Sequence, residues 1–214
     1  MNYILKIALA ILIFSTSSLS QTTDKEIAYT QVVAQRAYKI TASLQLSDSL
    51  QFKRVCGMIA KQYRDLNTVH ESLKTATKAQ PSPSEEELKQ LESEANTQLG
   101  QLHAQYISHL STELSATQIE KIKDGMTYGV LPNTYRAYQE MMPDLTEVQK
   151  AQILAYLTEA REHAMDAESS EKKHAWFGKY KGKINNYLSA QGIDMKKAGQ
   201  DWEKRIKEAQ AAKK

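Results

Sequence analysis

The stretch LTEVQKAQILAYLTEAREHAMDA, residues 145–167, decides the fold. Thr146 is followed three residues later by Gln149, which is the capping-box pattern found at helix N-termini. Small and apolar side chains then recur at the spacing of one helix face. They are Ile153, Leu157, Ala160 and Ala164. The stretch therefore predicts a helix over residues 147–167 that packs against a neighbour along this stripe.

The same signals recur outward along the chain. Ser84 with Glu87, and the phrase LSATQ at 114–118, are further capping boxes. Glycine and proline are scarce, at 8 and 4 of 214 residues, and few runs are rich in Val, Ile and Thr. Helices are expected over residues 25–44, 48–79, 85–112, 147–167, 171–190 and 194–214, with shorter ones between. The sequence predicts an all-α protein of six to eight helices, packed as a single bundle or an irregular array.

The first residues, MNYILKIALAILIFSTSSLSQ, have the layout of a signal peptide. The apolar run from Ile7 to Phe14 is too short to span a bilayer, and Ser18 and Ser20 are small residues suited to a cleavage site. We expect residues 1–20 to be removed near Ser20. Residues 21–214 would then form a single domain in the periplasm or outside the cell, with no membrane anchor. An ordinary hydrophobic first helix is the alternative.

Charge is unevenly distributed. Residues 84–124 hold 3 Lys against 8 acids, whereas residues 171–214 hold 12 Lys and Arg against 5 acids. The closely spaced prolines at 80–84 predict a flexible loop, and residues 194–214 predict a basic terminal helix. This basic third either attracts an anion or is a solvated helix face. No nucleic-acid-binding motif is present, so no nucleic-acid partner is expected.

One candidate site lies on the polar side of the helix at 147–167. Glu159, His163 and Asp166 follow one another at helical spacing, so that a carboxylate flanks the imidazole on each side. Such a group either binds a metal, acts as an acid–base unit, or is a surface hydrogen-bond pattern. The spacing matches no established metal motif, so no metal or cofactor is predicted. His174 is the candidate for a further histidine, and the catalytic candidates are His163, His174 and Asp166.

Two further groups of side chains suggest ligand binding. Trp176 lies among lysines that include Lys179; it either stacks on a sugar ring or closes the edge of the core. Gly125, Gly129 and Pro132 predict a constrained loop, with Asn133 capping the short helix that follows. This region carries polar and aromatic side chains suited to a hydroxylated ligand. They are Tyr128, Asn133, Tyr135 and Arg136.

The segments DGMTYG (124–129), EAREHAMDA (159–167), KHAWFGKYKG (173–182) and INNYL (184–188) resemble the hallmark phrases of a known family. KQYRDLNTVHE at 61–71 extends the resemblance over most of the chain. The family comprises exported bacterial proteins of unknown function that are labelled sugar-binding and associated with polysaccharide utilisation. The resemblance implies an exported helical protein that binds or processes carbohydrate as an accessory to glycan use, with a glycan or sugar acid as its partner.

A second likeness supports an alternative. LSATQ at 114–118 and LTEVQ at 145–149 are similar to the LTxxQ motif of small helical periplasmic chaperones. Those motifs stand at helix starts, where capping alone favours the same residues. The alternative is a periplasmic chaperone or stress protein with no small-molecule site.

Overall fold

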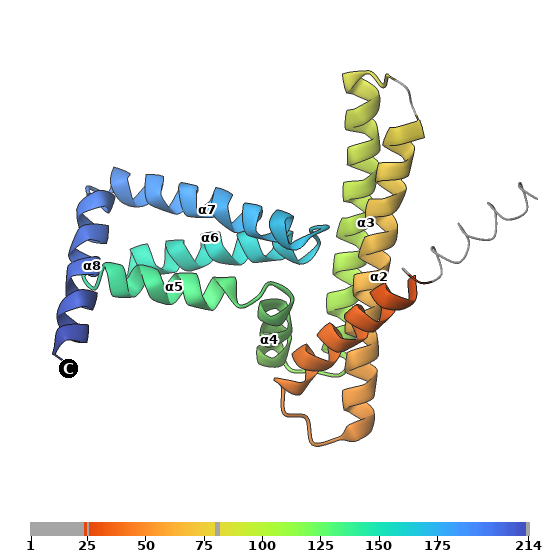
Figure 1. The fold of residues 1–214 in the computed structure, drawn as a ribbon, viewed down its shortest axis with the longest axis horizontal. Coiled ribbons are helices and arrows are strands. Elements are labelled where there is room, and N and C mark those ends of the chain that lie inside the picture. The colour runs from red at the N-terminus through yellow and green to blue at the C-terminus, as the bar shows by residue number, and fades with distance from the viewer. Residues whose placement is uncertain (1–23, 25, 80–81, 213–214) are drawn as a thin grey trace, which may run out of the picture. The chain divides into compact units, whose positions relative to one another are not determined.

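The computed structural model describes residues 24, 26–79 and 82–212, and every regular element among them is helical. This confirms the all-α prediction. Residues 26–42 are helical, and seven further helices follow (Figure 1). They are α2 (Ser49–Ala79), α3 (Glu85–Ser111), α4 (Ala116–Met126), α5 (Val130–Met141), α6 (Glu147–Met165), α7 (Ser170–Ala190) and α8 (Met195–Ala211).

Some expectations fall on parts of the chain that the structure does not describe. The signal peptide expected at residues 1–20 lies outside the described residues, as do residues 80 and 81 of the expected loop at 80–84. The basic terminal helix expected at 194–214 corresponds to α8. Across the described ranges, no helix combines the length and the apolar character needed to cross a membrane.

The described chain divides into two compact units, with the boundary inside α2 after Arg64. The first unit packs the helical residues 26–42 against the start of α2. Its core contains Val33, Ala37, Val55 and Ile59, all at most 1% exposed. The hydroxyl of Tyr29 donates a hydrogen bond to the carbonyl oxygen of Tyr63 at 3.0 Å. The expectation of a single domain stays a prediction.

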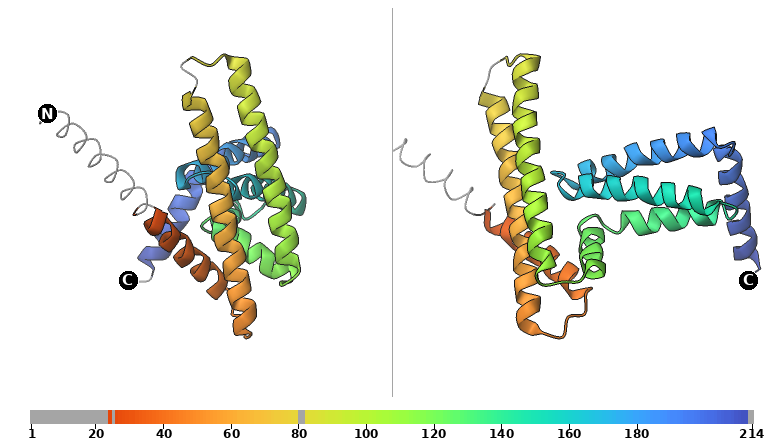
Figure 2. Two further views of the ribbon diagram at one scale, coloured as in Figure 1. Left: turned by 90° about the vertical axis from the view of Figure 1, so that its right-hand side faces the viewer. Right: turned by 180° about the vertical axis from the view of Figure 1, so that it is seen from behind.

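The second unit, Asp65–Lys214, is built around the pair α6 and α7. These two helices lie side by side, α5 runs along α6, and α8 packs against α5 and α7 (Figures 1 and 2). The expected stripe of α6 is fully buried and meets a matching stripe of α7. The residues of α7 in this core are Phe177, Tyr180, Ile184 and Leu188, at most 2% exposed.

All three predicted capping boxes are present. Ser84, Ser115 and Thr146 each accept a hydrogen bond from the backbone N–H of the residue three positions later. The side chains of those later residues, Glu87, Gln118 and Gln149, reach back to the backbone of the cap. Capping chemistry thus explains why α3, α4 and α6 begin where they do.

The segment expected to be a loop around residues 125–133 is mostly helical. Gly125 lies inside α4 and Pro132 inside α5, where a proline in the first turn interrupts no helical hydrogen bond. The connection is only three residues long because Tyr128 and Gly129 both adopt left-handed conformations, with φ of 60° and 65°. Asn133 therefore does not cap α5, since Gly129 holds that position.

Candidate functional site

The second unit contains a groove of about 560 Å³ at the junction of α2, α3, α6 and α7. It lies beside the turn that connects α6 to α7. Its lining combines aromatic, charged and amide side chains. They are His70, Asn96, Leu99, Gly100, His163, Asp166, Ala167, Glu168, Lys172 and Trp176.

Asp166 caps the C-terminus of α6 and links it to two other helices. Its backbone carbonyl oxygen lies 2.8 Å from Nε2 of His70 in α2, and because a carbonyl only accepts, Nε2 carries the proton. Its Oδ2 lies 2.8 Å from Nδ1 of His103 in α3. Its other oxygen, Oδ1, is shielded from solvent and accepts no hydrogen bond from any described residue. Asp166 thus keeps one acceptor unused beside the groove.

The turn that forms this end of the groove is fixed by two lysines. Lys173, 6% exposed, donates hydrogen bonds to the carbonyl oxygens of Ala164 and Met165, both at 2.8 Å. These carbonyls belong to the last turn of α6, and that of Ala164 also accepts a hydrogen bond from the backbone N–H of Ala167 at 3.3 Å. Lys74 of α2 forms an ion pair with Glu168 in the turn. The groove therefore has a rigid wall made by the chain between α6 and α7.

His163 and Trp176 form a stacked pair at the groove. Their ring centroids are 4.4 Å apart and their planes differ by 15°. His163 is exposed and Trp176 is half-buried against the core. The ammonium group of Lys179 lies 4.9 Å from the centroid of the indole ring. Trp176 thus closes the edge of the core and also lines the groove, while its stacking on a sugar ring stays a prediction.

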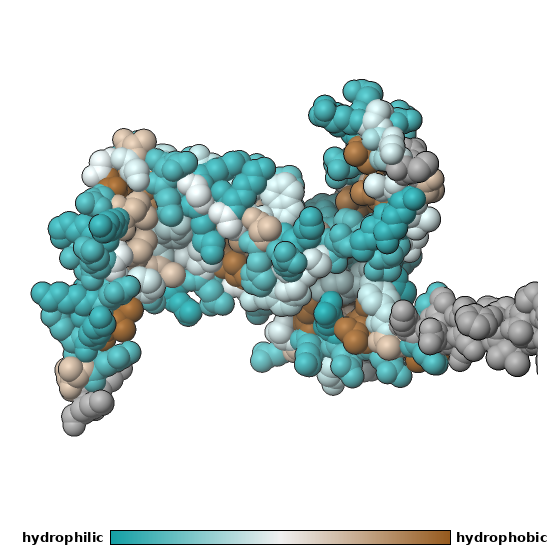
Figure 3. Space-filling model, turned by 45° about the horizontal axis from the view of Figure 1, so that its top comes forward, coloured by the Kyte–Doolittle hydropathy of each residue, from teal (hydrophilic) through white to brown (hydrophobic). Residues whose placement is uncertain are grey.

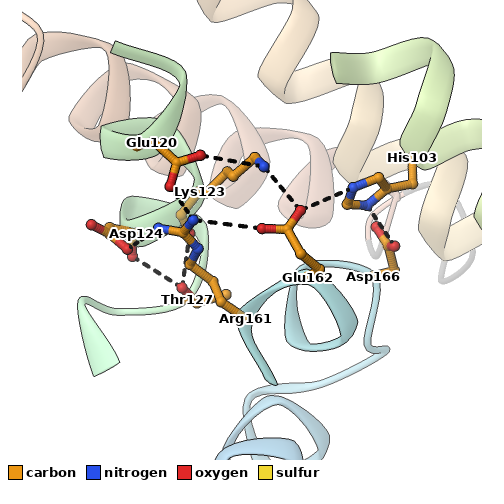
Figure 4. A network of polar contacts seen from close by, with 8 residues as sticks. All are labelled: His103, Glu120, Lys123, Asp124, Thr127, Arg161, Glu162 and Asp166. Carbon is orange, nitrogen blue, oxygen red and sulfur yellow. Dashed lines mark hydrogen bonds and ion pairs between the residues drawn. The ribbon is translucent and has the colours of Figure 1, made fainter. Parts of the chain in front are cut away.

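An ionic network beside the groove joins α3, α4 and α6 (Figure 4). Arg161, 2% exposed, pairs with Glu120 and with Asp124, whose Oδ1 is 2.7 Å from Nη1. Nζ of Lys123 lies 2.9 Å from Oε2 of Glu162. Three cations and four carboxylates take part: His103, Lys123, Arg161, Glu120, Asp124, Glu162 and Asp166.

This network sets the protonation of its members. Hydrogen bonds to Asp166 and then Glu162 raise the pKa of His103 to about 9. Burial alone would raise the pKa of Glu162, but hydrogen bonds from His103 and Lys123 outweigh it and lower that pKa to about 2. Both ring nitrogens of His103 face carboxylate oxygens, which only accept, so the ring is an imidazolium at neutral pH. It is a structural cation and not a general base.

The proposed Glu159, His163 and Asp166 group is divided among different partners. Glu159 accepts a hydrogen bond from the hydroxyl of Tyr180, His163 stacks on Trp176, and Asp166 pairs with His103. In the parts of the chain that the structure describes, no three His, Cys, Asp or Glu side chains are placed to hold a metal. These three side chains therefore make three separate contacts and do not form one group.

The other expected site residues do not line this groove. The ring of His174 stacks on that of Tyr128, with the two ring centroids 5.7 Å apart. Arg136 donates to Oδ1 of Asn133 at 3.1 Å on the surface of α5, and Tyr135 packs against the core. The structure therefore brings together His163, Asp166 and Trp176 in one groove, which the residues on and after the α4–α5 connection do not line.

Sequence reasoning missed what α2 and α3 contribute to the groove and to the ionic network beside it. His70, His103 and Asn96 lie on helices that the periodicity did predict, but nothing local indicates which helix they face. One signal was available for His103, because it follows Leu99 and Leu102, half-buried members of the apolar stripe of α3. A histidine at the edge of such a stripe lies at a helix interface.

A comparison with curated protein sequences finds no match for the chain. A family model described as "Protein of unknown function (DUF3826)" matches residues 30–208. That span includes every residue of the groove and of the ionic network. Because the match covers most of its length, the chain belongs to this family of unknown function, DUF3826.

Proposed function

We propose that this protein binds carbohydrate in the groove beside the α6–α7 turn, as an exported accessory to glycan use. The observation that carries the proposal is the stacked pair of His163 and Trp176 in one groove with Asp166, Lys172 and His70. The resemblance to proteins labelled sugar-binding supports the same ligand class. The signal-peptide pattern of residues 1–20 supports export to the periplasm or beyond the cell.

The lining suits the two chemical faces of a sugar. The C–H face of a pyranose ring packs on aromatic surface, which His163 and Trp176 supply. The rim of hydroxyl groups needs both donors and acceptors, which the amide of Asn96, the ammonium of Lys172 and the carboxylate of Asp166 supply. A volume of about 560 Å³ lies within the range of small-ligand sites.

The unused oxygen of Asp166 adds a specific reason for a hydroxylated ligand. A carboxylate oxygen that is shielded from water and has no donor is costly. A ligand hydroxyl that donates to it, after a small rotation of the carboxylate, would recover that cost. The other oxygen stays paired with His103, so the carboxylate keeps its place in the groove.

Isothermal titration against a panel of neutral and acidic oligosaccharides tests the proposal. We expect Trp176→Ala to weaken binding at least about tenfold, a loss of about 1.4 kcal/mol of binding free energy. Tyr38→Ala is the matched control, because Tyr38 is an exposed aromatic residue of the first unit. No binding to any oligosaccharide, or equal binding by the Trp176 variant, would refute the groove as a sugar site.

Catalysis at the same groove is a variant of this proposal. His163 lies in the groove, whereas His174 stacks on Tyr128, so His163 is the candidate acid–base group. Incubation with the bound oligosaccharide should then release product in the wild type and not in His163→Ala, while both bind. Unchanged oligosaccharide in both samples would mean binding without turnover.

A second candidate function, that of a chaperone, draws on the first unit. That unit has an apolar groove of about 630 Å³ lined by Tyr38, Phe52 and Cys56 among others. Leu50, in the first turn of α2, is 61% exposed. On the face in Figure 3, hydrophilic residues predominate and the apolar patches are separate from one another. The chaperone candidate therefore depends on the apolar groove of the first unit. It predicts suppression of client aggregation that Tyr38→Ala and Leu50→Ala both reduce; no suppression by the wild type would rule it out.

A further inference from the structure

A second groove, of about 440 Å³, lies between α5, α7 and α8. Each helix contributes residues that lie on one of its faces. Asn133 and Tyr138 come from α5, Lys181 and Asn185 from α7, and Trp202 from α8. Lys181 and Asn185 are four residues apart, so they lie one above the other along α7.

The walls of this groove are held by specific contacts. The hydroxyl of Tyr138 donates to Oδ1 of Asn185 at 2.7 Å, which joins α5 to α7. Arg205 donates to the carbonyl oxygens of Glu140 and Met141 at 3.0 and 2.9 Å, which fixes α8 on the last turn of α5. Trp202 is half-buried on the groove side of α8. The shape of the groove is therefore set by the packing of α5, α7 and α8.

The polar groups of this groove are predominantly donors. The amide oxygens of Asn133 and Asn185 already accept hydrogen bonds from Arg136 and Tyr138, which leaves their N–H groups for a ligand. Lys181 adds an exposed ammonium group. Among the residues that the structure describes, no aspartate or glutamate lines the groove. A ligand that fits must be rich in acceptors, and a negative charge beside Lys181 would be favourable.

We infer that the α5–α7–α8 groove is a second saccharide site, selective for sugars that carry a carboxylate, such as uronic acids. Trp202 packs against the C–H face of the ring, Lys181 pairs with the carboxylate, and the amides of Asn133 and Asn185 donate to ring hydroxyl oxygens. The inference rests on the proposed function, because it takes carbohydrate as the ligand class. It differs in chemistry from the first groove, whose lining contains the carboxylates of Asp166 and Glu168 beside Lys172.

Titration with two matched oligosaccharide sets tests the inference. One set contains oligomers of galacturonic, glucuronic and mannuronic acid, and the other contains their neutral galactose, glucose and mannose counterparts. We expect at least one uronate to bind at least about tenfold more weakly to Trp202→Ala and to Lys181→Gln. The affinity for neutral oligosaccharides, which Trp176→Ala should abolish, should be unchanged in Trp202→Ala and Lys181→Gln. Lys183→Gln is the control, because Lys183 is exposed on the same helix and its ammonium lies over the ring of Tyr180.

The outcomes separate this inference from the proposed function. Suppose that neutral sugars bind through Trp176, that uronates bind no more tightly than neutral sugars, and that Lys181→Gln does not change uronate affinity. The second site is then wrong and the proposed function stands. If uronates bind through Lys181 and Trp202 while Trp176→Ala has no effect on any sugar, the first groove is wrong and the second site stands. If no saccharide binds the wild type, both are wrong. Because Lys181 is exposed, Lys181→Gln should leave the fold intact, so a loss of binding in this variant reports on the site itself.

Discussion

Helix α6 meets its neighbours through two surfaces of opposite character. Toward α7 it presents an apolar seam, whose members Ile153, Leu157, Ala160 and Ala164 are all 0% exposed. Toward α3 and α4 it presents an ionic seam, formed by Arg161 and Glu162 with Asp166 just beyond the last turn. Ala160 and Arg161 are sequence neighbours, yet they belong to different seams.

The two seams contribute to stability in different ways. Burial of apolar surface stabilises in proportion to area and responds little to pH or salt. Charges removed from water lose hydration, and their pairing offsets that loss only where the geometry is good. The apolar seam therefore holds α6 and α7 together, whereas the ionic seam fixes how α6 meets α3 and α4. This second contact also places Asp166 at the groove.

The largest expected effect comes from opening the apolar seam. Leu157→Ala should lower the free energy of unfolding by about 3 to 4 kcal/mol, because it leaves a cavity between α6 and α7. Chemical denaturation followed by circular dichroism measures this. Leu154→Ala is the matched control on the same helix, 39% exposed, and should cost less than about 1 kcal/mol. Equal losses for the two variants would contradict the assignment of the seam.

A smaller effect is expected from the ionic seam. Arg161→Met keeps much of the apolar stem but leaves Asp124 without its cation and removes one of the two cations beside Glu120, and should cost about 2 kcal/mol. Because the side chain of Glu120 is 51% exposed, the loss should shrink at about 1 M salt, where screening is short-ranged. Arg136→Met, whose side chain is 70% exposed, should change stability by less than about 0.5 kcal/mol. A salt-independent loss would mean that Arg161 acts through packing.

The apolar seam was predictable from the sequence and the ionic seam was not. The spacing of Ile153, Leu157, Ala160 and Ala164 indicates a buried helix face without any knowledge of the partner. Capping boxes likewise depend on residues within one turn, so the starts of α3, α4 and α6 could be derived. At the connection between α4 and α5 the sequence predicts a longer loop than the structure has, because glycine and proline favour loops. Gly125 is tolerated in α4, and Pro132 fits the first turn of α5.

The candidate site was predictable only in part, for the same reason. His163, Asp166 and Trp176 lie within one helix–turn–helix, so local reasoning placed them near one another. His70 and His103 come from helices far away in sequence, and periodicity does not say which faces of two helices meet. The charge of His103 likewise depends on Asp166 and Glu162, which are distant in the chain.

The smallest of the three stability effects concerns His103, and it gives the ionic seam a pH dependence that the apolar seam lacks. The pKa of His103 is raised from its ordinary value near 6.5 to about 9, so the folded state binds this proton more tightly than the unfolded state. The stabilisation is therefore complete below about pH 6.5 and is lost as the pH rises through about 9. Its side chain is 22% exposed, and solvent screening reduces the contribution to about 1 to 2 kcal/mol.

His103→Gln isolates this contribution. Gln keeps hydrogen-bonding capacity toward Asp166 and Glu162 but carries no titrating proton, so the difference in unfolding free energy between wild type and variant should fall between about pH 6.5 and 9. His109→Gln is the control, because His109 is exposed on the same helix. Groups that do not contact His103 titrate equally in both proteins and cancel in the difference. The carboxylate of Glu162, whose pKa is about 2, stays ionised throughout this range. A difference that stays constant from pH 6 to pH 10 would mean that His103 is not held as an imidazolium, and that the link between α3 and the groove residue Asp166 is a neutral hydrogen bond.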